Sequence, residues 1–190
     1  MPAGLKGYAA ILSEIKAYPD LLLFLIAFLL YNDGIQTIIA VSAVFARDVL
    51  QLPRDSVIGC FLMVQFMAMP GALFFGWLAG KWGSKMIILL TLVLFMGVTA
   101  FAATITTSPQ FWVLGFVVAL ILGGSQAASR SMFASLIPPE RSAEFFGFYA
   151  VSAKFASILG PFLFALIGEM TGSPRLSILV LILLFGLGAL

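Results

Sequence analysis

Long apolar runs separated by short polar segments recur along the whole chain and predict helices that span a membrane. Ser108-Pro109 and Ser173-Pro174 are typical of helix starts, and Pro138-Pro139 is typical of a helix stop. The last run is short for a bilayer core of roughly 30 Å, so we expect its natural helix to continue further. The six expected helices cover residues 20–46, 55–79, 86–106, 109–137, 142–170 and 174–190.

Residues 1–19 precede the first apolar run. Apolar side chains recur there every three or four residues, with Lys and Glu among them. This pattern is typical of a short amphipathic helix on the cytoplasmic surface of the membrane. An ordinary linker ahead of the first span is the alternative.

Loop charges predict the orientation of the helices, because Lys and Arg concentrate in cytoplasmic loops. The N-terminal segment and the second and fourth loops together hold five basic residues, and the other loops hold three. This difference favours a cytoplasmic N-terminus. The residues are Lys6, Lys16, Lys81, Lys85 and Arg141 on the first side, and Arg47, Arg54 and Arg175 on the second.

The two halves of the chain resemble each other at an offset of 90 residues, which relates Gly34 to Gly124 and Gln36 to Gln126. A repeat of three helices crosses the membrane an odd number of times, so its second copy runs inverted, as in many secondary transporters. We therefore expect an all-α transmembrane bundle of six helices, built from two inverted three-helix repeats.

Composition supports this architecture and excludes several functions. The 190-residue chain is 62% hydrophobic and 9% charged, whereas soluble domains carry about 25% charged residues. The chain has no His, the commonest catalytic base and metal ligand, so we expect no enzymatic activity, no metal site and no cofactor. The net charge of +2 gives no reason to expect a nucleic-acid partner. The single Cys60 is expected to fill the core.

Three polar residues interrupt the first apolar run near its middle. Asn32 and Gln36 lie four residues apart with Asp33 between them, so we expect all three on one side of the helix. A carboxylate at this depth costs roughly 2.5–3.5 kcal/mol on insertion scales. Such groups usually face a wet cavity, which predicts an ion or solute pathway. A polar cluster that pins helix packing is the alternative.

Two basic residues are expected deep in the fourth and fifth helices. Arg130 follows Gln126 by about one turn, and it also lies near enough to the helix end to reach the interface instead. Lys154 lies near mid-depth, where Asp33 is the carboxylate available to it. The two residues form either a static pair or a site that gains and loses a proton during transport. Two positive charges against one negative charge predict an anionic or zwitterionic solute.

Small residues recur at every fourth position in three of the helices. Such ridges allow close packing, either within this bundle or against a second one. They leave open an alternative function as a non-transporting scaffold or partner-binding subunit. The ridges are Ala68, Ala72, Gly76 and Gly80; Gly115, Ala119, Gly123 and Ala127; and Ser152, Ala156, Gly160, Gly168 and Gly172, the last interrupted by Phe164.

The loop between the second and third helices resembles the motif G-x-x-x-D-R/K-x-G-x-R/K of the major facilitator superfamily. Gly76, Lys81, Gly83 and Lys85 match this motif, and Gly80 stands where the family usually has Asp. The resemblance implies that these five residues form a cytoplasmic gating loop. The carboxylate that would latch the loop to a neighbouring helix is replaced by Gly80.

Further segments are similar to the vacuole-effluxer branch of that superfamily, which includes fungal autophagy-linked permeases and many bacterial proteins. The similarity extends from about residue 20 to residue 188. The segments are Tyr31-Asn32-Asp33-Gly34, Gly124 to Ser131, Pro138 to Arg141, Glu144 to Tyr149 and Ser152 to Ala156.

The resemblance implies the C-terminal six-helix bundle of a twelve-helix permease, in a bacterial cytoplasmic membrane, that works by alternating access. Its partners would be the lipid bilayer, the missing N-terminal six-helix bundle and a small solute bound between the two bundles. Fungal members are associated with amino-acid efflux. We expect the substrate and ion pathway to involve Asn32, Asp33, Gln36, Gln126, Arg130 and Lys154.

Overall fold

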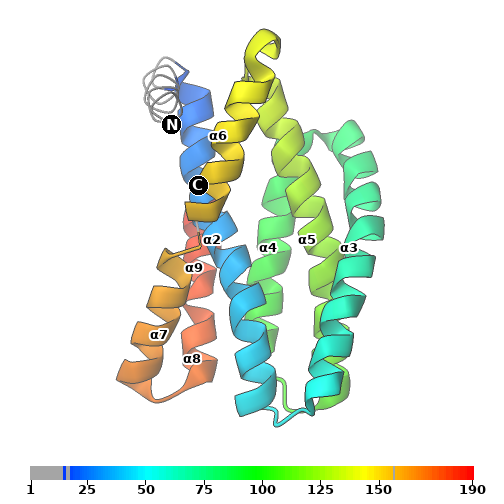
Figure 1. The fold of residues 1–190 in the computed structure, drawn as a ribbon, viewed down its shortest axis with the longest axis vertical. Coiled ribbons are helices and arrows are strands. Elements are labelled where there is room, and N and C mark those ends of the chain that lie inside the picture. The colour runs from blue at the N-terminus through cyan, green and yellow to red at the C-terminus, as the bar shows by residue number, and fades with distance from the viewer. Residues whose placement is uncertain (1–14, 16–17, 156) are drawn as a thin grey trace, which may run out of the picture.

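The computed structural model describes residues 15, 18–155 and 157–190, and the described part of the chain is almost entirely helical (Figure 1). The expected interfacial segment at residues 1–19 therefore lies almost wholly outside the described residues. The helices are α2 (Pro19–Asp48), α3 (Arg54–Trp82), α4 (Ser84–Ala102), α5 (Ser108–Leu136), the short 3-10 helix η1 (Pro139–Arg141), α6 (Ser142–Phe155), α7 (Leu159–Thr171), α8 (Pro174–Leu179) and α9 (Leu181–Ala189).

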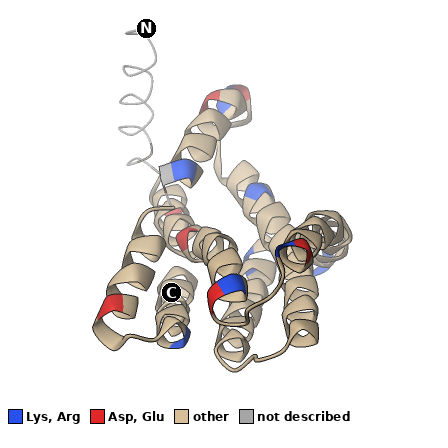
Figure 2. Ribbon diagram, turned by 60° about the horizontal axis from the view of Figure 1, so that its bottom comes forward, with Lys and Arg blue, Asp and Glu red and all other residues tan. Residues whose placement is uncertain are grey.

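The helices have the length and composition of membrane spans. Within the described residues, 5 helical segments are long and apolar enough to cross a bilayer, and α8 with α9 forms a shorter apolar helix. Figure 2 shows that most of the ribbon carries neither acidic nor basic residues. The all-α transmembrane bundle expected from the sequence is confirmed.

The connections alternate between the two ends of the bundle (Figure 1). The start of α2, the α3–α4 turn and the η1 connection lie at one end, here called the N-terminal end. The α2–α3, α4–α5 and α7–α8 connections lie at the opposite end. Each connection is short, so consecutive spans run antiparallel, with α6 and α7 forming one span and α8 and α9 another. Lys81, Lys85 and Arg141 therefore share the N-terminal end.

Helix packing divides the bundle into a tight part and a loose part. Helix α5 packs extensively on α3 and on α4, and α9 packs on α2 and α4. The pairs α4–α5 and α9–α2 correspond to each other in two three-helix repeats. The tight α3–α5 pair would correspond to α2 with α6 and α7, but these helices touch much less. The segment from α6 to α7 is therefore the loosely packed part.

Glycines bring α3 and α5 into backbone contact. A Cβ added at Gly123 would collide with the backbone of Ala68, and a Cβ at Gly71 would collide with the backbone of Leu120. The ridges expected on these two helices thus pack against each other within this bundle. The ridge on α3 extends further than the contact, because Gly76 and Gly80 have open space beside them.

The structure differs from the expected helix boundaries most in three places, and α4 (Ser84–Ala102) also ends before the expected residue 106. The helix expected over 142–170 is interrupted between α6 and α7, where Pro161 occupies the first turn of α7 and its missing N–H costs no hydrogen bond. Helix α3 continues to Trp82, so the α3–α4 turn consists of Gly83 alone, with a φ of 85° that suits glycine. The expected last helix is divided at Val180 into α8 and α9.

The α3–α5 contact predicts a clear stability difference between two glycine substitutions. Gly123→Ala should destabilise the protein by about 1–3 kcal/mol, because a backbone cannot move aside cheaply. Gly97→Ala is the matched control: Gly97 lies within α4 with nothing within 4 Å, so alanine should be neutral or stabilising by up to about 1 kcal/mol. Thermal unfolding of the detergent-solubilised protein measures both. Equal effects would contradict the proposed close packing.

Candidate functional site

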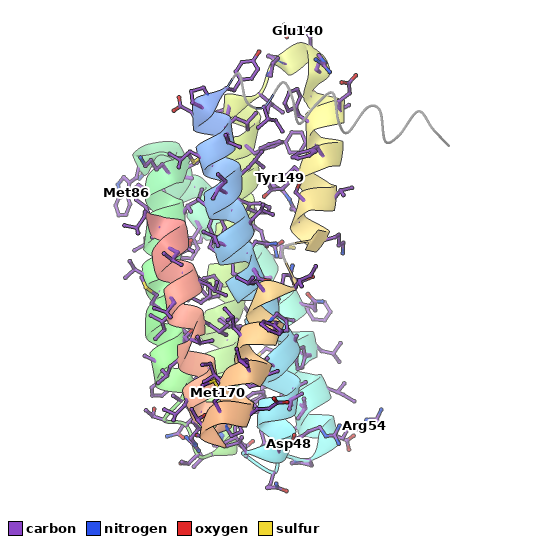
Figure 3. The ribbon with its side chains drawn as sticks, turned by 90° about the vertical axis from the view of Figure 1, so that its left-hand side faces the viewer. Asp48, Arg54, Met86, Glu140, Tyr149 and Met170 are labelled. Carbon is purple, nitrogen blue, oxygen red and sulfur yellow. The ribbon has the colours of Figure 1, made fainter. Side chains whose placement is uncertain are left out.

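A cavity of about 320 Å³ lies between α2, α5 and α6. Five of the six residues expected in the pathway line it, and Asp33 does not. Its wall carries hydroxyl, amide and cationic groups and, among the residues that the structure describes, no acidic side chain. Figure 3 shows Tyr149 pointing from α6 into the space beside α2. The lining residues are Phe28, Tyr31, Asn32, Ile35, Gln36, Ser125, Gln126, Ser129, Arg130, Phe146, Tyr149, Ala150, Ala153 and Lys154.

A chain of hydrogen bonds that begins at Tyr31 joins α2 to α5. The Tyr31 hydroxyl lies 2.7 Å from the Ser129 hydroxyl, and Ser129 donates to the Ser125 carbonyl at 2.6 Å. Because the single Ser129 proton is used in the second bond, Tyr31 must be the donor in the first. Tyr31, Ser125 and Ser129 are all buried. They form a fixed polar floor for the cavity.

Ser125 of this floor and the neighbouring Asn32 face the cavity with spare hydrogen-bonding capacity. The Ser125 hydroxyl is buried and has no hydrogen-bond partner among the described residues. The Asn32 amide donates to the Ala153 carbonyl at 3.3 Å and so joins α2 to α6, while its carbonyl oxygen remains available. Gln36 and Gln126 are half-buried beside them. A solute in the cavity would therefore meet both donors and acceptors.

Arg130 on α5 and Lys154 on α6 form a cationic rim. Both side chains are exposed, in contrast to the buried floor. Neither makes an ion pair with Asp33, whose two carboxylate oxygens lack any hydrogen-bond partner within the described part of the chain. The static Asp33–Lys154 pair considered from the sequence is therefore wrong for this conformation.

Asp33 lies on a different side of α2 from Asn32 and Gln36. Successive residues of a helix are about 100° apart, so neighbours can face different helices. Asp33 is 3% exposed, and its turn of α2 packs on the start of α7, where a Cβ added at Gly160 would meet Thr37 and the Asp33 carbonyl. Among the described residues, its carboxylate has no hydrogen-bond partner. The expectation that all three polar residues share one side is thus corrected.

An aromatic cluster closes the cavity toward the N-terminal end. Tyr149 stacks on Phe28 with ring centroids 4.4 Å apart and on Phe133 with centroids 4.6 Å apart. Phe133 also meets Phe146 edge-on at 5.2 Å. The cluster joins the same three helices that line the cavity. The sequence carries a signal for this cluster that was missed, because Phe24, Phe28 and Tyr31 recur about one turn apart just before Asn32.

The residues expected in the gating loop lie at the N-terminal end of the bundle and do not line the cavity. Lys81 lies over the Trp77 ring, with its Nζ 3.8 Å from the ring centroid. Ser84 at the start of α4 donates to the Ser131 hydroxyl on α5 at 3.0 Å. Gly76 and Gly80 are on the last turns of α3 and Lys85 is exposed on α4. Their gating role stays a prediction.

No group of three or more His, Cys, Asp or Glu side chains able to hold a metal ion occurs among the residues that the structure describes. Cys60 is buried, at 3% exposure, and packs against Gly115 of α5. Its position agrees with the expected packing role.

Comparison with known proteins identifies similar chains in bacteria and fungi. The model of the family described as "Vacuole effluxer Atg22 like" matches residues 1–190. The "Uncharacterized MFS-type transporter YxiO" of Bacillus subtilis (strain 168) is 38% identical over 183 residues, covering 96% of this chain and 42% of that protein. "Autophagy-related protein 22" of Saccharomyces cerevisiae (strain ATCC 204508 / S288c) is 29% identical over 173 residues, covering 83% of this chain and 32% of that protein. The chain thus spans less than half the length of these relatives.

The hydrogen-bond chain predicts an order of stability for three substitutions measured without solute. Ser129→Ala should cost about 1–3 kcal/mol, because it leaves the buried Tyr31 hydroxyl without its acceptor. Tyr31→Phe should cost about 0.5–1.5 kcal/mol, because Ser129 keeps its bond to the Ser125 carbonyl. Ser125→Ala removes an unpartnered hydroxyl and should be neutral. Thermal unfolding tests the order, and a Ser125→Ala cost equal to that of Ser129→Ala would contradict it.

Proposed function

The chain belongs to the vacuole effluxer Atg22-like family and is an integral, multi-pass membrane protein, and from this premise we propose that it is the C-terminal half of a secondary active transporter. The main observation that supports this proposal is the cavity between α2, α5 and α6, which is lined by five of the six predicted pathway residues. A purely structural polar cluster would leave no space of this size between its members. The cavity would be the solute site.

The missing partner would be an N-terminal six-helix bundle. The curated relatives are more than twice as long as the stretch that they share with this chain, which leaves room for such a bundle. Helix α3 also presents an exposed apolar stripe at helical spacing, suited to lipid or to a second bundle. The solute would bind between the bundles, and rocking of one against the other would give alternating access. The stripe consists of Leu62, Phe66, Met69, Leu73 and Trp77.

The chemistry of the cavity favours a solute with a negative group. Arg130 and Lys154 supply two cations at the rim, and none of the described residues that line the wall is acidic. A guanidinium and an ammonium group both donate charge-assisted hydrogen bonds to carboxylate or phosphate oxygens. The acceptors on Asn32 and Gln36 suit a positive or neutral donor on the same molecule. The proposed solute is an amino acid or another small zwitterionic or anionic compound.

Orientation, location and coupling complete the proposal. We place the N-terminal end of the bundle in the cytoplasm, in a bacterial cytoplasmic membrane. The Gly76 to Lys85 segment would then be a cytoplasmic gate. The excess of basic residues on that side comes from Lys6 and Lys16, which lie outside the described residues; the described loops on each side have three. The proposed driving force is a proton gradient.

Removing either cation from the rim should weaken solute binding. In the complete protein, leucine, glutamate, lactate and phosphate serve as probes, and binding appears as a rise in the unfolding temperature. Arg130→Gln and Lys154→Gln should each require about 10-fold or more of the stabilising probe, since a hydrogen bond to a charged group contributes about 1.5–3 kcal/mol. Arg54→Gln is the control, because Arg54 is an exposed cation at the opposite end.

Two outcomes would contradict the proposal. If all three variants needed the same probe concentration for stabilisation, Arg130 and Lys154 would not contribute to solute binding. A complete protein that binds none of the four probes and transports none of them in proteoliposomes would instead favour the scaffold or partner-binding function.

A further inference from the structure

An open apolar groove runs along the outer side of α4. Figure 3 shows Met86, near the start of this helix, on the outside of the bundle. Residues three and four apart share one face of a helix, so the lining side chains of α4 follow one another along the helix. None of the described residues that line the solute cavity belongs to α4, so the groove is a separate site. It is lined by Trp82, at the end of α3, and by Met86, Leu89, Leu90 and Val93 of α4.

The groove has the length of one hydrocarbon chain. Gly97 lies one turn beyond Val93, is exposed, and has nothing within 4 Å of an added Cβ, so the surface stays open there. A helix rises about 1.5 Å per residue, so the distance from Met86 to Gly97 is about 16 Å. One leaflet of a bilayer core of roughly 30 Å has about this depth. The groove can therefore hold an acyl chain over most of its length.

Two lysines flank the α3–α4 turn, at the N-terminal end of the groove. Lys81 and Lys85 are both exposed, and the Nζ of Lys81 lies 3.8 Å from the centroid of the Trp77 ring. Within the described part of the chain, neither lysine forms an ion pair. The sequence has no Asp or Glu between Asp55 and Glu140. The positive charge of this turn therefore has no acidic partner from α4 or α5, or from α3 beyond its first turn.

We propose that this groove binds an anionic phospholipid, with its headgroup at Lys81 and Lys85 and one acyl chain along α4 toward Gly97. Charge at the end of the span and an apolar surface beneath it follow the order of groups in a lipid. Basic residues at the end of a span attract anionic lipids, and Trp is enriched at the same depth because its ring is amphipathic. A zwitterionic lipid fits the groove equally well but gains less from the two lysines. The proposal does not depend on solute transport.

Quenching of Trp82 fluorescence measures which lipid occupies the groove. The complete protein, with Trp82 as its single tryptophan, is reconstituted in phosphatidylcholine vesicles. Increasing amounts of phosphatidylglycerol or phosphatidylcholine with brominated acyl chains are then included, because bromine quenches a tryptophan that it touches. Half-maximal quenching should need a mole fraction of brominated phosphatidylglycerol at least about 5-fold lower than that of brominated phosphatidylcholine, since one basic residue at an anionic membrane surface contributes about this factor.

Three double variants test whether the two lysines cause this preference. Lys81→Gln with Lys85→Gln should make the two brominated lipids equally effective. Lys81→Arg with Lys85→Arg keeps both charges and should keep the preference. Arg47→Gln with Arg54→Gln removes two exposed cations from the opposite end of the bundle and should also keep it.

Three outcomes would overturn the proposal. The first is equal quenching by the two lipids before any lysine is replaced. The second is a preference for phosphatidylglycerol that persists in the double glutamine variant of the lysines. The third is the absence of quenching by either lipid, which would show that a second copy of the chain or another protein segment covers the groove.

Discussion

A polar group within the thickness of a bilayer has no water to bind, so the bundle itself must satisfy it or hold it beside a wet cavity. This constraint explains the arrangement around α2. Tyr31 and Asn32 bond to α5 and α6, and Thr37 bonds to the carbonyl of its own helix. Gln36 opens onto the cavity, and Asp33 is buried where α2 packs on the start of α7.

The bundle combines two kinds of packing that suit different tasks. Backbone contact at Gly71 and Gly123 allows α3 and α5 almost no relative movement, because protein interiors transmit strain rather than absorb it. The α6–α7 segment is held to α2 and α5 by stacked rings around Tyr149, by the Asn32 bond and by the approach of Gly160 to Thr37. These few contacts can be exchanged at lower cost. Any movement within this half of the protein is therefore expected at α6 and α7.

The separation of charges also has a physical consequence. An Asp33–Lys154 pair would neutralise both residues and leave the cavity with little attraction for an anion. In the structure the Asp33 carboxylate is buried outside the cavity, whereas Arg130 and Lys154 are exposed at the cavity rim. A negative solute group can then approach Arg130 and Lys154 without competition.

The apolar runs by themselves determined the helices, their alternating direction and the membrane environment, because length and hydropathy are local properties of the chain. They also marked Asn32, Gln36, Gln126, Arg130 and Lys154 as candidates, since polar groups are costly in such runs. Tertiary structure alone decided that Asp33 faces α7, that α6 and α7 are separate, and that an aromatic cluster closes the cavity. A helix places neighbouring residues about 100° apart, and only the packing of the other helices decides which neighbour each one meets.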